Sequence, residues 1–371
     1  MIRSALRTAA LAVLLVLGPI PAFAGQAQQD TESRIAAETY PMAVFVTGAG
    51  VETPHGFAAG MADARAGGAL TVDTPMRIAS NTKTFVAATV LRLWEQGRID
   101  LDAAIGPLLT PALDALLRAD GFATDRIAVR QLLSHSAGLY DHGSDPRFIE
   151  AVLADPAHVW TREEQVRASM TWADPQSQPG TEFRYSDTGY ILLGDIVERI
   201  TGKSLAQSVR EQLHFDRLGL ATTWWEIAEP APATATPRSR QALGETDATD
   251  VHASMDLYGG GGLLMSPRDL ATFFAALFED RVFDRPETLR EMLWQGPHRG
   301  AEGYRLGIFV KQIGGRDVYW HSGFWGTLAY YDPATRTAIA GMSANQQGFR
   351  PLRTIVEDMI AAQAVMPVPA P

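Results

Sequence analysis

The sequence predicts an α/β (α+β) fold in which one antiparallel sheet, built from both termini, is flanked by helices and carries a mostly helical inserted subdomain. Apolar runs of strand length lie near both ends of the chain, while residues 101–254 show mainly helical patterns. The chain has 371 residues, 46% of them hydrophobic and 20% charged, which is typical of a globular protein. No internal repeat is present, so we expect one large domain over residues 35–362.

The first 24 residues match the pattern of a secretory signal peptide. Arg3 and Arg7 precede a short apolar run at 9–17, and Ala22-Phe23-Ala24 supplies a small-residue cleavage site. The run is shorter than the roughly 20 residues that span a bilayer, and an uncleaved anchor is the alternative. The chain has no cysteine that could carry a lipid. We therefore expect a secreted or periplasmic protein with no stable membrane anchor after cleavage.

The N-terminal part of the mature chain is expected to open with a flexible segment, residues 25–34. Residues 42–46 form an apolar run that predicts a strand, and residues 56–61 can pair with it across a turn-rich segment. Residues 80–96 are dense in apolar side chains and are followed by Gly97, which predicts a helix buried on most of its surface.

The same patterns predict the later elements. Helices are expected near residues 128–135, 162–170, 188–200, 204–213, 267–278 and 351–364, and strands near residues 306–312, 316–322, 328–331 and 337–342. The proline-rich residues 363–371 are expected to form a flexible tail.

Composition and missing motifs exclude several functions. The formal charge is −10 and no Lys/Arg cluster occurs, which argues against a nucleic-acid partner. Without cysteine there are no disulfides, thiolate metal sites or cysteine nucleophile. No G-x-S-x-G or H-E-x-x-H motif is present, and His135 and His142 do not share a helical face. The glycine run 259–262 lacks the lysine of a phosphate loop and predicts a tight turn. No metal or organic cofactor is expected.

Ser80 and Lys83 form the one S-x-x-K motif of the chain, and Lys83 is one of three lysines. Residues three apart share a helical face, so the lysine amine can reach the serine hydroxyl. A serine becomes a strong nucleophile when a base accepts its proton, and a buried lysine can be that base if its pKa is lowered. The motif therefore indicates nucleophilic catalysis. A serine that merely caps the helix is the structural alternative.

Four further stretches accompany this motif in a recognisable order. They are 132–139 (Leu-Leu-Ser-His-Ser-Ala-Gly-Leu), 179–190 (Pro-Gly-Thr-Glu-Phe-Arg-Tyr-Ser-Asp-Thr-Gly-Tyr), 260–263 (Gly-Gly-Gly-Leu) and 321–323 (His-Ser-Gly). With them, the chain resembles the serine β-lactamase-related family, which contains class C β-lactamases, D,D-carboxypeptidases, D-aminopeptidases and some esterases. The resemblance covers roughly residues 35–362 and implies a β-lactamase/transpeptidase-like fold.

The resemblance also implies roles for single residues. Ser80 would be the nucleophile, and Tyr185 would share the proton transfers with Lys83. The backbone N–H groups of Ser80 and Phe324 would form the oxyanion hole, where each donor contributes roughly 3–4 kcal/mol.

His321-Ser322-Gly323 stands where the family usually has Lys-Thr-Gly, on a strand that would border the cleft. Gly323 would let substrate approach the backbone closely. His321 would orient a substrate carboxylate or tune Tyr185, and a solvated strand histidine is the alternative.

Asp187 departs from the asparagine that the family usually carries after the Tyr185 position. An asparagine amide can donate to a substrate carbonyl, whereas an ionised aspartate can only accept. Two interpretations stay open. Asp187 either caps the helix that follows it, or it shifts substrate preference towards groups that donate N–H and away from carboxylates.

We predict an exported serine hydrolase that acts through a Ser80 acyl-enzyme on a peptide, amide or ester bond of a small-molecule or peptide substrate. The departures at Asp187 and His321 favour a peptidase or esterase. A true class C-type β-lactamase and a non-catalytic binding protein that keeps the fold are the alternatives. The oligomeric state is left open.

Overall fold

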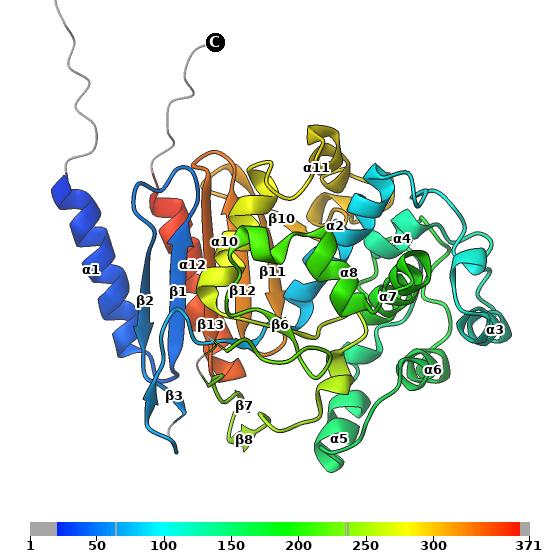
Figure 1. The fold of residues 1–371 in the computed structure, drawn as a ribbon, viewed down its shortest axis with the longest axis horizontal. Coiled ribbons are helices and arrows are strands. Elements are labelled where there is room, and N and C mark those ends of the chain that lie inside the picture. Colours follow the sequence, from blue (N-terminus) through cyan, green and yellow to red (C-terminus); the bar gives the residue numbers. More distant parts are fainter. Residues whose placement is uncertain (1–20, 64, 234, 236, 364–371) are drawn as a thin grey trace, which may run out of the picture.

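The computed structural model describes residues 21–63, 65–233, 235 and 237–363. Its largest sheet is antiparallel and has the strand order β10-β11-β12-β13-β1-β2 (Figure 1). The strands are β1 (Met42–Thr47), β2 (His55–Ala59), β10 (Phe309–Ile313), β11 (Arg316–Gly323), β12 (Thr327–Asp332) and β13 (Thr337–Ser343).

The pairing of β1 with β13 joins the two ends of the chain. Its register runs from Met42 opposite Ser343 to Thr47 opposite Ala338. Strands from the first and last parts of the described chain are therefore neighbours, which confirms the predicted sheet built from both termini. The predicted strands 42–46, 316–322, 328–331 and 337–342 all fall within the strands of this sheet.

Helices cover both faces of this sheet. Helix α10 (Pro267–Phe278) packs against β1, β12 and β13 on one face, and α12 (Phe349–Ala362) contacts β10, β12 and β13 on the other. Alternation along β1 explains the two cores, because Ala43 and Phe45 join the cluster with α10 whereas Val44 and Val46 join the cluster with α12.

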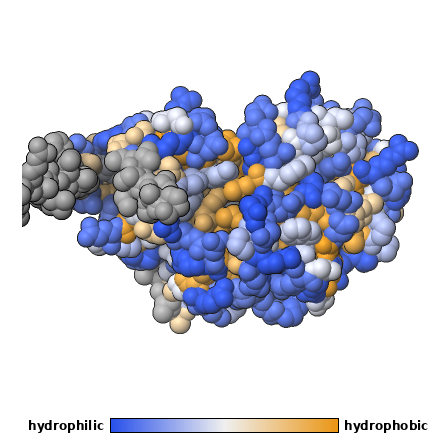
Figure 2. Space-filling view, turned by 90° about the horizontal axis from the view of Figure 1, so that it is seen from above, coloured by the Kyte–Doolittle hydropathy of each residue, from blue (hydrophilic) through white to orange (hydrophobic). Residues whose placement is uncertain are grey.

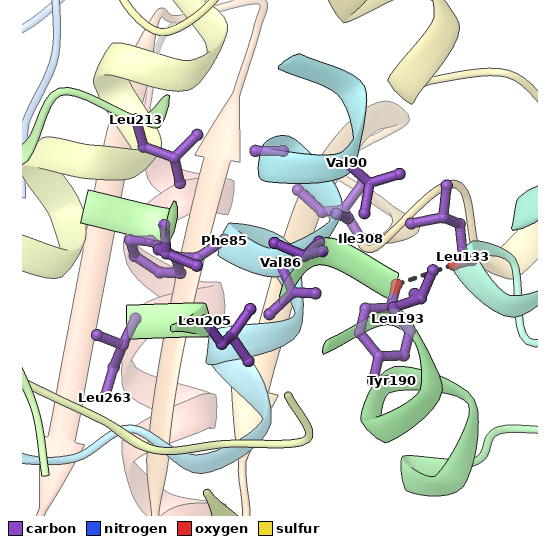
Figure 3. Close-up of a cluster of buried hydrophobic side chains, with 14 of the residues drawn as sticks. Phe85, Val86, Val90, Leu133, Tyr190, Leu193, Leu205, Leu213, Leu263 and Ile308 are labelled. Carbon is purple, nitrogen blue, oxygen red and sulfur yellow. Dashed lines mark hydrogen bonds between the residues drawn. The ribbon is translucent and has the colours of Figure 1, made fainter. Parts of the chain in front are cut away.

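Helix α2 (Thr82–Glu95) runs through the middle of the molecule and is buried over most of its length. It packs against α7 (Asp187–Thr201), α8 (Leu205–Gln212) and α11 (Pro286–Met292). Figure 3 shows Phe85, Val86 and Val90 of α2 among side chains from these surroundings. This packing against three helices fixes the position of α2, and with it the first turn next to Ser80.

The remaining helices between residues 101 and 254 are α3 (Pro111–Ala119), α4 (Val129–Leu133), α5 (Pro146–Ala154), α6 (Arg162–Trp172) and α9 (Phe215–Leu218). Of these helices, α4 and α6 contact α7, α3 contacts α6, and α9 contacts α8 and α10. The surface seen from above is mostly hydrophilic, with hydrophobic residues showing near its middle (Figure 2).

Short strands that the sequence patterns did not predict pair distant segments of the chain near Ser80. One small sheet has the order β5-β9-β6 and pairs Met76 with Met265 and Trp224 with Leu264. Its strands are β5 (Met76–Arg77), β6 (Trp224–Trp225) and β9 (Leu263–Met265). Two further pairs are β3 (Met61–Asp63) with β4 (Gly68–Ala69), and β7 (Ala242–Leu243) with β8 (Thr246–Asp247). The β5–β9 pairing brings the segment before Ser80 beside the glycine run 259–262.

Residues 25–34, expected to be flexible, lie within helix α1 (Pro21–Ala37), and this expectation is wrong in the structure. Ile35 is buried in the cluster on the α12 side of the sheet, and Arg34 pairs with Asp358 at 2.8 Å. These two contacts hold the end of the helix on the sheet.

The predicted signal peptide and C-terminal tail fall mainly on residues 1–20 and 364–371, which lie outside the described residues. Within the described part of the chain, no helix combines the length and the apolar character needed to cross a bilayer.

Candidate active site

Ser80 lies in a short 3-10 segment, Ala79–Asn81, that leads directly into α2. Its side chain is half-buried, and Ala79 before it has a φ of +44°, which is uncommon for a residue with a Cβ. The cap positions of this segment and of α2 are Ile78 and Asn81, neither of which makes a side-chain capping bond. Ser80 is therefore not a helix cap, and the structural alternative for this serine is wrong.

Lys83 is completely buried and its ammonium group has three oxygen neighbours. Nζ lies 2.9 Å from Ser80 Oγ, 2.8 Å from the Gly260 carbonyl oxygen and 2.5 Å from Asp187 Oδ1. An ammonium has three donors, so this environment matches the protonated form of the side chain.

The charge state of Lys83 decides whether this side chain can accept the Ser80 proton directly. Burial lowers the pKa of Lys83, but the negative charge of Asp187 and a hydrogen bond to it outweigh burial and raise the pKa above its ordinary value. Burial likewise raises the pKa of Asp187, yet the charge of Lys83 brings it below its ordinary value. The condition under which a lysine acts as the base, a lowered pKa, is therefore not met in this arrangement, because the lysine is held as an ammonium by a carboxylate.

Asp187 is the first residue of α7, and Ser186 occupies the N-cap position. The backbone N–H of Asp187 donates to Asp141 Oδ1 at 2.8 Å, while its carboxylate contacts Lys83. The N-cap interpretation of Asp187 is therefore wrong. The interpretation as a determinant of substrate preference stays a prediction.

Tyr185 lies just before α7 with its ring beside Lys83, whose Nζ is 5.1 Å from the ring centroid. The side chains of Ser80 and Lys83 both act on the pKa of the tyrosine hydroxyl, which places the hydroxyl near them. Burial raises the pKa of Tyr185, and the charge of Lys83 only partly offsets this, so the side chain is a neutral phenol at neutral pH. The structure thus brings the three predicted catalytic side chains together.

Two more carboxylates, Asp141 and Asp256, lie close to the Lys83–Asp187 pair. Burial and the charge of Asp187 raise the pKa of Asp141 to about 7 and that of Asp256 to about 7. The glycine run 259–262 makes room for this group, because a Cβ built at Gly261 would overlap the Asp256 carboxylate. Gly259 and Gly262 have φ values of +130° and +117°, as the predicted tight turn requires.

The C-terminal end of β11 lies against the segment that carries Ser80. A Cβ built at Gly323 would overlap the Ile78 carbonyl oxygen, so the protein's own backbone approaches this glycine closely. The expected close approach of a substrate stays a prediction. Ser322 is half-buried and Phe324 is 39% exposed. The oxyanion hole formed by the N–H groups of Ser80 and Phe324 stays a prediction, supported by this contact between the two segments.

His321 is 1% exposed, so the alternative of a solvated strand histidine is wrong. Its Nε2 lies 3.3 Å from the Tyr304 hydroxyl, and Trp320 beside it points to the opposite face, where it stacks on Tyr330. Burial and the charge of Lys83 lower the pKa of His321 to about 3. The imidazole is therefore neutral at neutral pH and carries no charge for a substrate carboxylate.

The sequence reasoning missed several residues of this site. Asp141, Asp256 and Tyr304 stand in no motif, and the role of Gly260 is carried by its carbonyl oxygen, which no side-chain pattern reveals. His135 does stand in the motif 132–139, but its residue type alone indicates no role in catalysis.

A cavity of about 410 Å³ lies beside the loop that carries His135. Ser134, Ser136, Arg130 and Trp294 are among its lining residues, whereas Ser80 and Lys83 are not. Arg130 is already paired with Asp102 at 2.7 Å. This cavity is separate from the hydrogen-bonded group around Lys83.

Comparisons with known proteins point to one family. The family model described as Beta-lactamase matches residues 34–362. The chain is similar to a D-aminopeptidase of Brucella anthropi, with 31% identity over 71% of this chain and 48% of that protein. It is also similar to esterase EstB of Burkholderia gladioli, with 33% identity over 48% of this chain and 44% of that protein.

A solved structure has a fold similar to that of this chain. The crystal structure of a D-stereospecific amidohydrolase from Streptomyces sp. superposes with a TM-score of 0.76 and 26% identity, covering 91% of this chain and 99% of that one. The chain spans just under half of the length of the two curated relatives above.

Proposed function

This chain belongs to the beta-lactamase family, and from that premise we propose that it is an exported serine hydrolase that cleaves a peptide, amide or ester bond through a Ser80 acyl-enzyme. The observation that carries the proposal is the group formed by Ser80, Lys83 and Tyr185. Lys83 Nζ lies 2.9 Å from Ser80 Oγ and 5.1 Å from the centroid of the Tyr185 ring, and both Ser80 and Lys83 act on the pKa of the Tyr185 hydroxyl. A nucleophile with two proton-carrying neighbours is the arrangement that acyl transfer requires.

Acylation begins when Ser80 Oγ attacks the substrate carbonyl carbon. Lys83 can accept the Ser80 proton only after it has released one of its own, and Asp187 at 2.5 Å is the acceptor in contact with it. The charged pair is the resting state, so this proton shift is part of the barrier. The bond to the leaving group then breaks as Tyr185 donates its proton to the leaving nitrogen or oxygen and regains one from Lys83.

Deacylation reverses these roles. Water attacks the acyl-enzyme carbonyl and its proton passes to the Tyr185–Lys83 pair, while Ser80 Oγ leaves and is reprotonated. The N–H groups of Ser80 and Phe324 are the proposed donors to the oxyanion in both steps.

We favour substrates that present an amine or another N–H donor near Ser80. Asp187 already neutralises Lys83, so above neutral pH Asp141 and Asp256 add negative charge around the site and oppose a substrate carboxylate. The similarity to a D-aminopeptidase supports this preference. Esterase activity is the second candidate, supported by the similarity to esterase EstB. A class C-type β-lactamase fits less well, because its substrates carry a carboxylate.

The test compares the mature wild type with Ser80→Ala on a short-chain nitrophenyl ester, on nitroanilides of D-amino acids and on a chromogenic β-lactam. Ser33→Ala, an exposed serine on α1, is the matched control. We expect hydrolysis by wild type and Ser33→Ala and loss of at least about 10³-fold in Ser80→Ala. Equal rates in Ser80→Ala would refute the proposed nucleophile. No turnover of any substrate by the wild type would favour a binding protein that keeps the fold.

A further inference from the structure

His135 occupies a buried and conformationally unusual position in the loop after α4. Its side chain is 2% exposed and its φ is +54°, in the left-handed region that residues with a Cβ seldom adopt. Such a conformation persists where surrounding contacts hold it, and it occurs often at functional sites. The loop is anchored in turn, because the Tyr190 hydroxyl donates to the Leu133 carbonyl oxygen at 2.9 Å (Figure 3).

His135 holds the chain on both sides of Tyr185. Its carbonyl oxygen accepts the backbone N–H of Arg184 at 2.7 Å, and its ring Nδ1 accepts the backbone N–H of Ser186 at 3.1 Å. The two bonds come from one residue and reach the two neighbours of the tyrosine. They therefore fix the backbone from which the Tyr185 ring projects towards Ser80 and Lys83.

The imidazole ring of His135 also packs against Tyr185 itself. Their ring centroids are 4.2 Å apart, and Tyr304 and Tyr190 lie at 4.8 and 5.0 Å from the same imidazole. Since Nδ1 accepts a hydrogen bond, the proton of the neutral imidazole is on Nε2. The ring thus fills the space behind the tyrosine and leaves it little freedom to turn away.

We propose that His135 is a positioning residue that holds the Tyr185 hydroxyl at Ser80 and Lys83. This inference rests on the proposed function, because it assigns to His135 an effect on the proton transfers of Tyr185. In this role His135 acts only through the tyrosine and not on the Ser80 hydroxyl.

Two substitutions test separately the hydrogen bond from Ser186 to the His135 ring and the packing of that ring against Tyr185. His135→Phe keeps a ring but removes the acceptor, so the N–H of Ser186 loses its partner in a buried place. His135→Asn keeps an acceptor, because asparagine Oδ1 branches from the same carbon as Nδ1 and asparagine tolerates the left-handed region, but it removes most of the ring. His298→Phe, at another buried histidine, is the control for packing changes alone.

The deciding experiment is a double-mutant cycle with Tyr185→Phe, measuring kcat, KM and the melting temperature for ester hydrolysis. We expect His135→Phe to lower kcat about 100-fold with little change in KM, and His135→Asn to lower it less. In the Tyr185→Phe background the same substitutions should change kcat by less than about threefold, because the group they position is gone.

Equal fold losses in the wild-type and Tyr185→Phe backgrounds would overturn the proposal, as would wild-type kcat in both His135 variants. If His135→Phe does not fold, His135→Asn carries the same comparison. Ser80→Ala distinguishes failure of the proposed function from failure of the role of His135. Activity retained in Ser80→Ala would refute the proposed function itself. Loss of activity in Ser80→Ala, together with His135 effects on kcat that are equal in both backgrounds, would refute only the role of His135.

Discussion

Lys83 Nζ and Asp187 Oδ1 lie 2.5 Å apart, so an ammonium and a carboxylate form an ion pair directly beside Ser80. Lys83 is completely buried, and the side chain of Asp187 is 21% exposed. In the family that the motifs resemble, an asparagine usually stands at this position and has no charge to hold the lysine proton. The pair therefore sets the charge of the group that must receive the Ser80 proton.

Replacing Asp187 by asparagine should move the pH dependence of hydrolysis. Without the carboxylate, burial dominates and the pKa of Lys83 falls, so a larger fraction of the lysine is neutral at a given pH. We expect the acidic limb of kcat/KM to shift to lower pH in Asp187→Asn, measured from pH 5 to 10. An acidic limb at the wild-type pH would contradict the control of Lys83 by Asp187. Asp216→Asn, at an aspartate whose side chain is 94% exposed, is the control.

Asp256 should make the fold less stable as the pH rises. Its pKa is about 7 in the folded chain, above the ordinary aspartate value, so the folded state binds a proton that the unfolded state has released. The resulting loss of folding free energy is absent at pH 4 and below, grows between pH 4 and 7 and is constant above pH 7. Asp256→Asn removes it, so we expect the variant to gain about 4 kcal/mol over wild type at pH 8 and little at pH 4.

Urea unfolding of Asp256→Asn and wild type at pH 4, 6 and 8 measures this difference. An equal difference at all three pH values would show that the carboxyl of Asp256 titrates at the same pH in the folded and unfolded chains.

Gly323 should tolerate no side chain. A Cβ there would overlap the Ile78 carbonyl oxygen, and backbone cannot move aside as a flexible side chain does. We expect Gly323→Ala to destabilise the fold by about 1–3 kcal/mol and to slow labelling of Ser80 by a fluorophosphonate, because β11 and the segment before Ser80 are forced apart. Gly303→Ala is the matched control, since a Cβ there meets no atom within 4 Å. Equal melting temperatures and labelling rates in both variants would contradict this close approach.

Export should remove the first turn of α1. If the signal peptide is cleaved after Ala24, the mature chain begins at Gly25, four residues into helix α1. The anchoring contacts of Arg34 and Ile35 lie beyond that point. We expect intact mass and N-terminal sequencing of the exported protein to give Gly25, and the melting temperature of a chain that starts at Gly25 to match that of the full chain within about 2 °C. An exported protein that keeps residue 1 would favour the uncleaved anchor.

Periodicity was enough to predict most of the long elements and a sheet built from both termini. Residues 80–96 and 267–278 have the apolar density of buried helices, and strands such as β12 and β13 are apolar runs bounded by turn residues. The strands β5, β6 and β9 have two or three residues each, too few for any period, and they pair segments that are far apart in the sequence. Helix α1 was missed because its burial rests mainly on the end near Ile35.

The three catalytic side chains of the candidate site were predictable from the sequence, but their charges were not. Ser80, Lys83 and Tyr185 stand in motifs, and the structure brings them together. The pKa of Lys83 depends on how closely Asp187 approaches it, and a sequence gives no such distance. The carbonyl of Gly260 and the left-handed backbone of His135 belong to the main chain, where residue type says little. For Gly323 the sequence indicated a close approach but not its partner.

The pairing of β1 with β13 also bears on when this chain can fold. Strand β1 has two neighbours, and one of them, β13, is synthesised long after it. Contacts between distant segments slow folding, because a long loop must close before they form. A nascent chain therefore carries an incomplete sheet until its C-terminal strands are available. A polypeptide that threads through an export channel must stay unfolded for the same period, so the order of strands in this sheet suits the passage that its N-terminal sequence predicts.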